Sequence, residues 1–79
     1  MAGIAPFNFP AMIPLWMYPL SITLGNTYVL KPSEKVAGTS EMLIDLLQQS
    51  GVPKGVVNVV QGGEETVTRI CTHPNIKAV

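Results

Sequence analysis

Residues in two short segments could do chemistry. Asn8 lies on a bend between Pro6 and Pro10, while Lys31 and Glu34 stand three positions apart just after a run with high β-propensity. Each proline fixes its own φ angle and restricts the residue before it, so the Asn8 amide can donate hydrogen bonds from a fixed position. The lysine offers a donor and the glutamate an acceptor at the end of a predicted strand. We expect these groups to form half of a site, whose other half comes from elsewhere.

Both segments also have ordinary structural interpretations. Lys31 and Glu34 could form a local ion pair in a solvated loop, which contributes little to stability. Asn8 could be a turn or cap residue whose side chain bonds to nearby backbone. Spacing alone leaves these alternatives open.

Three further features of the sequence are predicted to have structural roles rather than catalytic or ligand-binding ones. The Gly-Gly pair at 62–63 precedes two glutamates that would repel a phosphate, so we predict a tight turn before a helix. Cys71, the sole cysteine, excludes an internal disulfide, and we predict a partly buried, inert thiol. His73 has no second histidine or cysteine pair near it in the sequence, so no metal site is predicted.

Size and charge exclude several classes of protein. The chain has 79 residues, enough for one small domain. Its formal net charge is zero, and its five lysines and arginines are scattered along the sequence. A nucleic-acid-binding surface needs clustered basic residues to neutralise phosphates, so we expect no nucleic-acid partner.

The first 30 residues contain no charged side chain and no histidine, which raises the alternative of a membrane-anchored apolar N-terminal segment. The apolar run at 11–24 is shorter than the roughly 20 residues that a spanning helix needs. Four prolines between residues 6 and 19 oppose a straight helix, and a secretory signal would begin with basic residues. We therefore expect no membrane partner.

Hydrophobic periodicity and chain breakers predict strands and helices in alternation. The strands are expected at 2–5, 27–30, 56–60 and 76–79. Two helices are expected at about 10–24 and at 64–72. Between them, a third helix should begin at a Thr39 or Ser40 cap and end at Ser50. This β-α-β-α-β-α-β order predicts an α/β fold with a parallel sheet covered on both faces. Ligands of such sheets bind outside the carboxyl ends of the strands, where Asn8, Lys31 to Glu34, and the glycine pair all lie.

The sequence also predicts how the helices pack. The first helix is apolar on all sides and is therefore expected to be buried all round. The second should place Glu41 in its first turn, where the helix dipole favours a carboxylate. Its expected buried stripe consists of Met42, Leu43, Leu46 and Leu47.

Several runs together resemble the NAD-binding domain of aldehyde dehydrogenases. They are residues 2–17, 25–27, 30–34, 51–60 and 73–76. The chain is most similar to the methylmalonate-semialdehyde dehydrogenase branch, the CoA-acylating type, and the resemblance covers essentially all 79 residues. It implies that residues 1–79 are a partial NAD-binding domain, with a Rossmann-like parallel sheet of the aldehyde dehydrogenase type.

The resemblance implies a role for individual residues. Ala5 and Phe7 match positions that line the NAD cleft, and Lys31 and Glu34 match the pair that holds the adenine ribose hydroxyls. A carboxylate there accepts from the 2′-hydroxyl and repels a 2′-phosphate, which favours NAD over NADP. Lys35 matches a position near the adenosine that is usually arginine in this branch.

Asn8 resembles the asparagine that donates to the aldehyde oxygen as a thiolate attacks the carbonyl carbon. The implied parent activity is NAD-dependent oxidation of a semialdehyde through a covalent thioester, with transfer of the acyl group to coenzyme A. The nucleophilic cysteine and the general-base glutamate would follow residue 79, so the segment alone is expected to be inactive. A non-catalytic α/β binding module that uses the same loops is the alternative.

The resemblance also implies a parent enzyme that is a homodimer or homotetramer. It would lie in the mitochondrial matrix of a eukaryote or in the cytoplasm of a bacterium. Its small-molecule partners would be the semialdehyde and coenzyme A.

Overall fold

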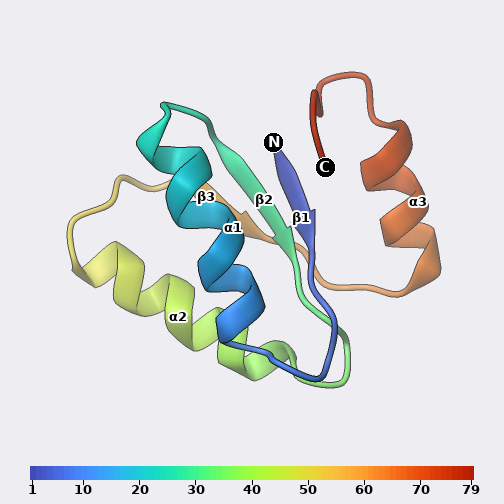
Figure 1. Cartoon of the computed structure of the whole chain (residues 1–79), viewed down its shortest axis with the longest axis horizontal. Coiled ribbons are helices and arrows are strands. Elements are labelled where there is room, and N and C mark those ends of the chain that lie inside the picture. Colours follow the sequence, from blue (N-terminus) through green and yellow to red (C-terminus); the bar gives the residue numbers. More distant parts are fainter.

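Three parallel strands lie at the centre of the molecule, and three helices surround them (Figure 1). The computed structural model describes residues 1–79. In chain order the elements are β1 (Ala2–Ile4), α1 (Met12–Thr23), β2 (Tyr28–Lys31), α2 (Ala37–Gln49), β3 (Val57–Val59) and α3 (Glu64–Thr72). The alternation and the parallel sheet confirm the predicted α/β fold class.

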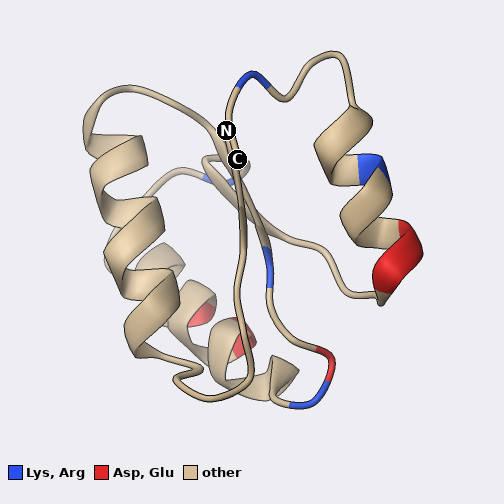
Figure 2. Ribbon diagram, turned by 45° about the vertical axis from the view of Figure 1, so that its right-hand side comes forward, with Lys and Arg blue, Asp and Glu red and all other residues tan.

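The order of the strands in the sheet is β1-β2-β3, so β2 is central. In the register, Val29 lies opposite both Ala2 and Asn58. Both crossovers step in the same direction, and right-handed connections therefore place α1 and α2 on the same face. Figures 1 and 2 show these two helices on one side of the sheet and α3 on the other. The carboxyl ends of the strands meet at one edge.

The hydrophobic core lies between the sheet and helices α1 and α2. Leu30 on the central strand is fully buried because it has a strand on either side and a helix layer above it. The side chains that join it in the core are Ala5, Tyr18, Tyr28, Ile44 and Val57. Burial raises the pKa of the two tyrosine hydroxyls above their usual 10.

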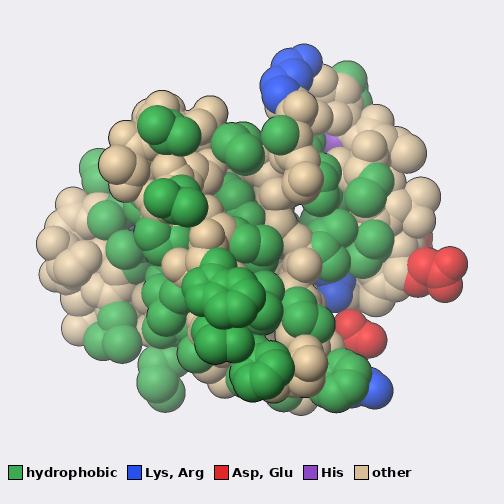
Figure 3. All heavy atoms as spheres, viewed as in Figure 1, with side chains coloured by type: hydrophobic (Ala, Val, Ile, Leu, Met, Phe, Trp, Pro, Cys, Tyr) green, Lys and Arg blue, Asp and Glu red, His purple; other side chains and the backbone are tan.

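Helix α1 is apolar on every side but covered on only one. It begins at Met12 rather than at Pro10, and Tyr18 is buried, whereas Trp16 is 60% and Leu20 71% exposed. Figure 3 shows apolar side chains gathered on this face of the molecule. The prediction of a helix buried all round is therefore wrong for this chain, in which the sheet and α2 leave the outer side of α1 open. None of the three helices has the length and apolarity that crossing a membrane requires.

Helix α2 begins earlier than predicted. The expected cap at Thr39 or Ser40 and the expected place of Glu41 in the first turn are both wrong, because the N-cap is Val36 and no side chain caps the helix. The Val36 N–H donates to the Ser33 carbonyl at 3.1 Å. This turn starts the helical path before residue 39.

The buried stripe of α2 is shifted around the helix from the predicted one. Ser40 and Ile44 are buried, whereas Met42 is 67% and Leu46 55% exposed. The other two predicted leucines are half-buried. Residues four apart lie on the same face, so Ser40 and Ile44 define the contact with the sheet. The Ser40 hydroxyl is buried there without a hydrogen-bond partner.

The C-terminal part of the chain agrees with the prediction only up to Thr72. Helix α3 has the predicted bounds, but residues 76–79 do not form the predicted fourth strand. A single bond, from the Ala2 N–H to the Ala78 carbonyl at 3.0 Å, joins them to β1, and a ladder needs repeated bonds. Cys71 is exposed rather than partly buried, because Ile70 faces inward and the next residue of a helix points about 100° away.

Gly3 is expected to be intolerant of a side chain. A Cβ at Gly3 would collide with the Tyr28 hydroxyl, which lies across β1, whereas a Cβ at Gly38 in α2 would meet no atom within 4 Å. Gly3→Ala should cost about 1–3 kcal/mol of unfolding free energy through overpacking. Gly38→Ala should add up to about 1 kcal/mol by restricting the unfolded chain. Urea denaturation followed by circular dichroism measures both, and a neutral Gly3→Ala would contradict the packing described here.

Candidate functional site

The two segments singled out from the sequence leave the sheet at neighbouring points. β1 and β2 are adjacent and parallel, so the loops that follow them start at the same edge. The Ala5 N–H donates to the Lys31 carbonyl at 2.9 Å, which continues the pairing one residue beyond β1. Figure 1 shows the two loops side by side below the sheet.

A second contact joins these loops farther from the sheet. The Lys35 ammonium nitrogen lies 4.9 Å from the centroid of the Phe7 ring, within the range of a cation–π interaction. Phe7 is 57% exposed, so the contact lies at the surface. Sequence reasoning did not find it, because no spacing rule relates residues on two separate loops.

Lys31 is a buried cation at the end of β2. It is 3% exposed, and its ammonium donates to the Pro32 carbonyl at 2.8 Å and to Glu34 Oε2 at 3.4 Å. Burying a charge is costly unless it is paired and hydrogen-bonded, so these two acceptors account for its position. An ammonium has three N–H donors, and these bonds use two of them. Lys31 therefore lies at the end of the strand with its ammonium held by its own loop.

Glu34 is the exposed partner of this pair. The Glu34 backbone amide, the hydrogen bond from Lys31 and the Lys31 charge lower the pKa of the Glu34 carboxyl below its usual 4.5. Its side chain is 62% exposed, so the ionised carboxylate can accept further hydrogen bonds from the solvent side. A fixed donor and an ionised acceptor next to each other suit a ligand with adjacent hydroxyl groups.

Asn8 is exposed, and its amide forms no hydrogen bond within the chain. The N-cap of α1 is Ala11, so Asn8 does not cap that helix. The Phe9 carbonyl accepts from the Ile13 N–H at 3.3 Å, which fixes the far end of the loop. The interpretation of Asn8 as a turn or cap residue is therefore not supported, and its amide is free to donate to a ligand.

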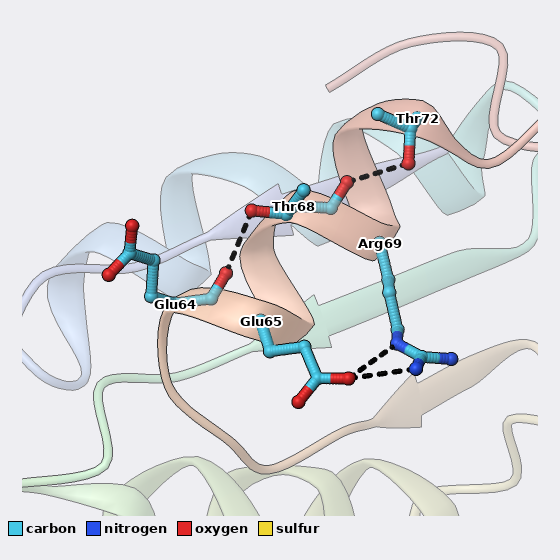
Figure 4. A network of polar contacts seen from close by, with 5 residues as sticks. All are labelled: Glu64, Glu65, Thr68, Arg69 and Thr72. Carbon is cyan, nitrogen blue, oxygen red and sulfur yellow. Dashed lines mark hydrogen bonds and ion pairs between the residues drawn. The ribbon is translucent and has the colours of Figure 1, made fainter.

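The glycine pair after β3 forms a turn into α3, as predicted. Gly63 is the N-cap of the helix, and Glu64 and Glu65 lie in its first turn. Figure 4 shows Glu65 Oε1 accepting from two nitrogens of Arg69, at 2.8 and 3.1 Å. Within this helix Glu65 and Arg69 thus pair with each other at the surface.

The largest hollow of the chain lies away from these loops. It has a volume of about 450 Å³ and lies between β1 and the C-terminal half of α1, near the amino ends of the strands. Eight of its ten lining residues are hydrophobic, among them Met17, Leu20 and Leu24. We assign the candidate site by its polar groups, at the opposite edge of the sheet, and not by the size of this hollow.

The Glu34 carboxyl is expected to titrate below 4.5. Because its folded pKa is lower than the unfolded value of about 4.5, its contribution to unfolding free energy is present above that pH and disappears as pH falls through the folded pKa. Glu34→Gln should remove this part of the pH dependence of the melting temperature. Asp45→Asn, on the exposed side of α2, is the control. Carboxyl ¹³C NMR measures the titration directly, and a value at or above 4.5 would contradict the geometry.

Known proteins resemble this chain over nearly its whole length. The model of the aldehyde dehydrogenase family matches residues 1–79. A probable mitochondrial, acylating methylmalonate-semialdehyde/malonate-semialdehyde dehydrogenase of Dictyostelium discoideum is 62% identical over 78 residues, which are 99% of this chain and 15% of that protein. The corresponding mitochondrial, acylating enzyme of Homo sapiens is 58% identical over the same shares. The chain thus spans about 15% of the length of these relatives.

Solved structures agree with the sequence relatives. The methylmalonate-semialdehyde dehydrogenase of Oceanimonas doudoroffii superposes with a TM-score of 0.97 at 49% identity, over 100% of this chain and 16% of that one. A putative methylmalonate-semialdehyde dehydrogenase of Sinorhizobium meliloti, complexed with NAD, has a TM-score of 0.93 at 48% identity, over 95% of this chain and 15% of that one. Because the family model covers the whole sequence and the backbone superposes throughout, this chain belongs to the aldehyde dehydrogenase family.

Proposed function

We propose that this segment forms part of the NAD pocket, and supplies one oxyanion donor, in a CoA-acylating dehydrogenase of methylmalonate or malonate semialdehyde. One observation carries the proposal. The 2.9 Å bond from the Ala5 N–H to the Lys31 carbonyl brings the Asn8 loop and the Lys31–Glu34 pair to the same edge of the sheet. The names of the similar enzymes support the substrate and the acylating reaction.

The polar groups of the second loop fit the adenine ribose of NAD. The free N–H of Lys31 can donate to a hydroxyl oxygen, while the ionised Glu34 carboxylate can accept from the 2′-hydroxyl. Ala5 and Phe7 would line the cleft beside them, and Lys35 would lie near the adenosine. The NAD complex of the Sinorhizobium meliloti structure supports this cofactor.

The amide of Asn8 would act on the aldehyde oxygen. When a cysteine thiolate from elsewhere in the enzyme adds to the aldehyde carbon, negative charge develops on that oxygen, and a donor already in place stabilises it. Bound NAD supplies the hydride acceptor for the oxidation. The acyl group, then held as a cysteine thioester, would pass to the thiol of coenzyme A. Asn8 thus needs no proton transfer, only a fixed position.

The names of the relatives support a location for the parent enzyme. Those from eukaryotes are named mitochondrial, which supports the matrix as the location in a eukaryote and leaves the bacterial cytoplasm as the counterpart. A homodimer or homotetramer remains the proposed assembly.

Asn8→Ala should lower kcat about 10²- to 10³-fold, which corresponds to about 2.7–4 kcal/mol of lost transition-state stabilisation. The variant is tested in a full-length enzyme carrying residues 1–79, for instance the Dictyostelium discoideum relative with this segment in place of its own. Asn75→Ala, at an exposed asparagine beyond α3, is the control. An unchanged kcat with Asn8→Ala would favour the alternative of a binding module without a catalytic group.

Glu34→Gln should weaken discrimination between the two nicotinamide cofactors. It removes the negative charge that repels a 2′-phosphate, so the ratio of kcat/KM for NADP to that for NAD should rise about tenfold, the equivalent of about 1.4 kcal/mol. Steady-state kinetics with each cofactor measure this ratio. Glu64→Gln provides a control on α3, and equal ratios in the wild type and Glu34→Gln would remove the ribose assignment.

A further inference from the structure

Pro6 and Pro10 restrict the backbone of the loop that carries Asn8, but hydrogen bonds fix this loop only at its two ends and not at its tip. The Ala5 N–H is bonded to the Lys31 carbonyl, and the Phe9 carbonyl is bonded to the Ile13 N–H. Between these anchors, Pro6, Phe7 and Asn8 form no hydrogen bond, whether through backbone or side chain. Their side chains are also exposed, so packing does not immobilise them.

The Lys35 ammonium supplies the missing contact. It lies 4.9 Å from the centroid of the Phe7 ring. Lys35 is itself held by a turn, because the Ser33 hydroxyl accepts from the Lys35 N–H at 3.4 Å and the Ser33 carbonyl accepts from the Val36 N–H at 3.1 Å. Ser33 is 8% exposed, so this turn is anchored in the protein. The backbone of Lys35 is therefore held, and its exposed ammonium meets the ring of the residue next to Asn8.

We infer that Lys35 is a positioning residue, which holds the Asn8 amide in place through its cation–π contact with the Phe7 ring. The inference rests on the proposed role of Asn8. The role of Lys35 would then differ from contact with the adenosine. The lysine limits the motion of the loop, so that the Asn8 amide is already in position when negative charge develops on the aldehyde oxygen.

The experiment separates positioning from cofactor binding by measuring kcat and KM apart. Lys35→Met keeps the length of the side chain and removes its charge, and Phe7→Leu removes the ring. Each should lower kcat at saturating NAD and aldehyde by about two- to fivefold, the loss expected of an exposed cation–π contact. Lys35→Arg should restore most of the rate, because a guanidinium also stacks on an aromatic ring.

The double variant gives the sharpest test. If the two side chains act through one contact, Phe7→Leu combined with Lys35→Met should lose no more kcat than either alone. Lys54→Met, at an exposed lysine before β3, is the matched control and should leave both constants unchanged. All variants are compared in the full-length chimera, with melting temperatures to confirm that they fold.

Two results would overturn the inference. If Lys35→Met raises only the KM for NAD and leaves kcat intact, the lysine binds cofactor and does not position Asn8. If the losses of the two single variants multiply in the double variant, the contact is not the cause. Failure of the proposed function looks different, because Asn8→Ala itself would then leave kcat unchanged.

Discussion

The parallel pairing of β1 with β2 is the constraint on which the arrangement of the polar groups depends. Parallel strands direct their carboxyl ends to the same edge, and the hydrogen bond from Ala5 to Lys31 extends the pairing to the point where both loops begin. Two segments more than 20 residues apart in the sequence are thereby brought within contact distance. The cation–π contact between Phe7 and Lys35 is a consequence of that pairing, as is the start of the Asn8 loop at the same edge as the Lys31–Glu34 pair.

Leu30 shows why this pairing is stable. It is fully buried on the central strand, and the next residue of the strand is the buried Lys31. The apolar side chain anchors β2 beneath α1 and α2, while the cation that follows must satisfy its donors locally, through the Pro32 carbonyl and Glu34. Packing thus determines where the strand ends, and the cost of an unpaired buried charge determines the conformation of the loop.

Much of the fold could be predicted from the sequence, because each element has a local signal. Valine-rich or aromatic runs bounded by glycine and proline mark β2 and β3, and α3 has the predicted bounds. The shifted start of α2 could not be found in this way, since it depends on a turn at Ser33 and not on a capping side chain. The stripe of α2 was misplaced because Ser40, a polar residue, is fully buried, while the apolar Met42 and Leu46 are exposed.

The candidate site was predictable to a different extent. The adjacency of the two loops follows from the alternation of elements, but the burial of Lys31 and the free amide of Asn8 are tertiary properties that no local pattern encodes. The exposed outer side of α1 is a property of the same kind. An apolar residue such as Trp16 indicates that a neighbour is suitable there but not whether the chain supplies one.

The hydrogen bond from the Ala2 N–H to the Ala78 carbonyl shows on which side of β1 the end of the chain lies. Alternate residues of a strand direct their N–H groups to opposite sides, so Ala78 lies on the side of β1 away from β2, whereas β3 lies beyond β2. After β3 the chain has therefore crossed back over the sheet, by way of α3 on the other face (Figure 1). In open α/β sheets a crevice forms beyond the carboxyl ends of the strands where the chain order reverses, a topological switch point. Here the order reverses between β1 and the segment that holds Ala78, so the loop that leads from β1 to Asn8 borders that point.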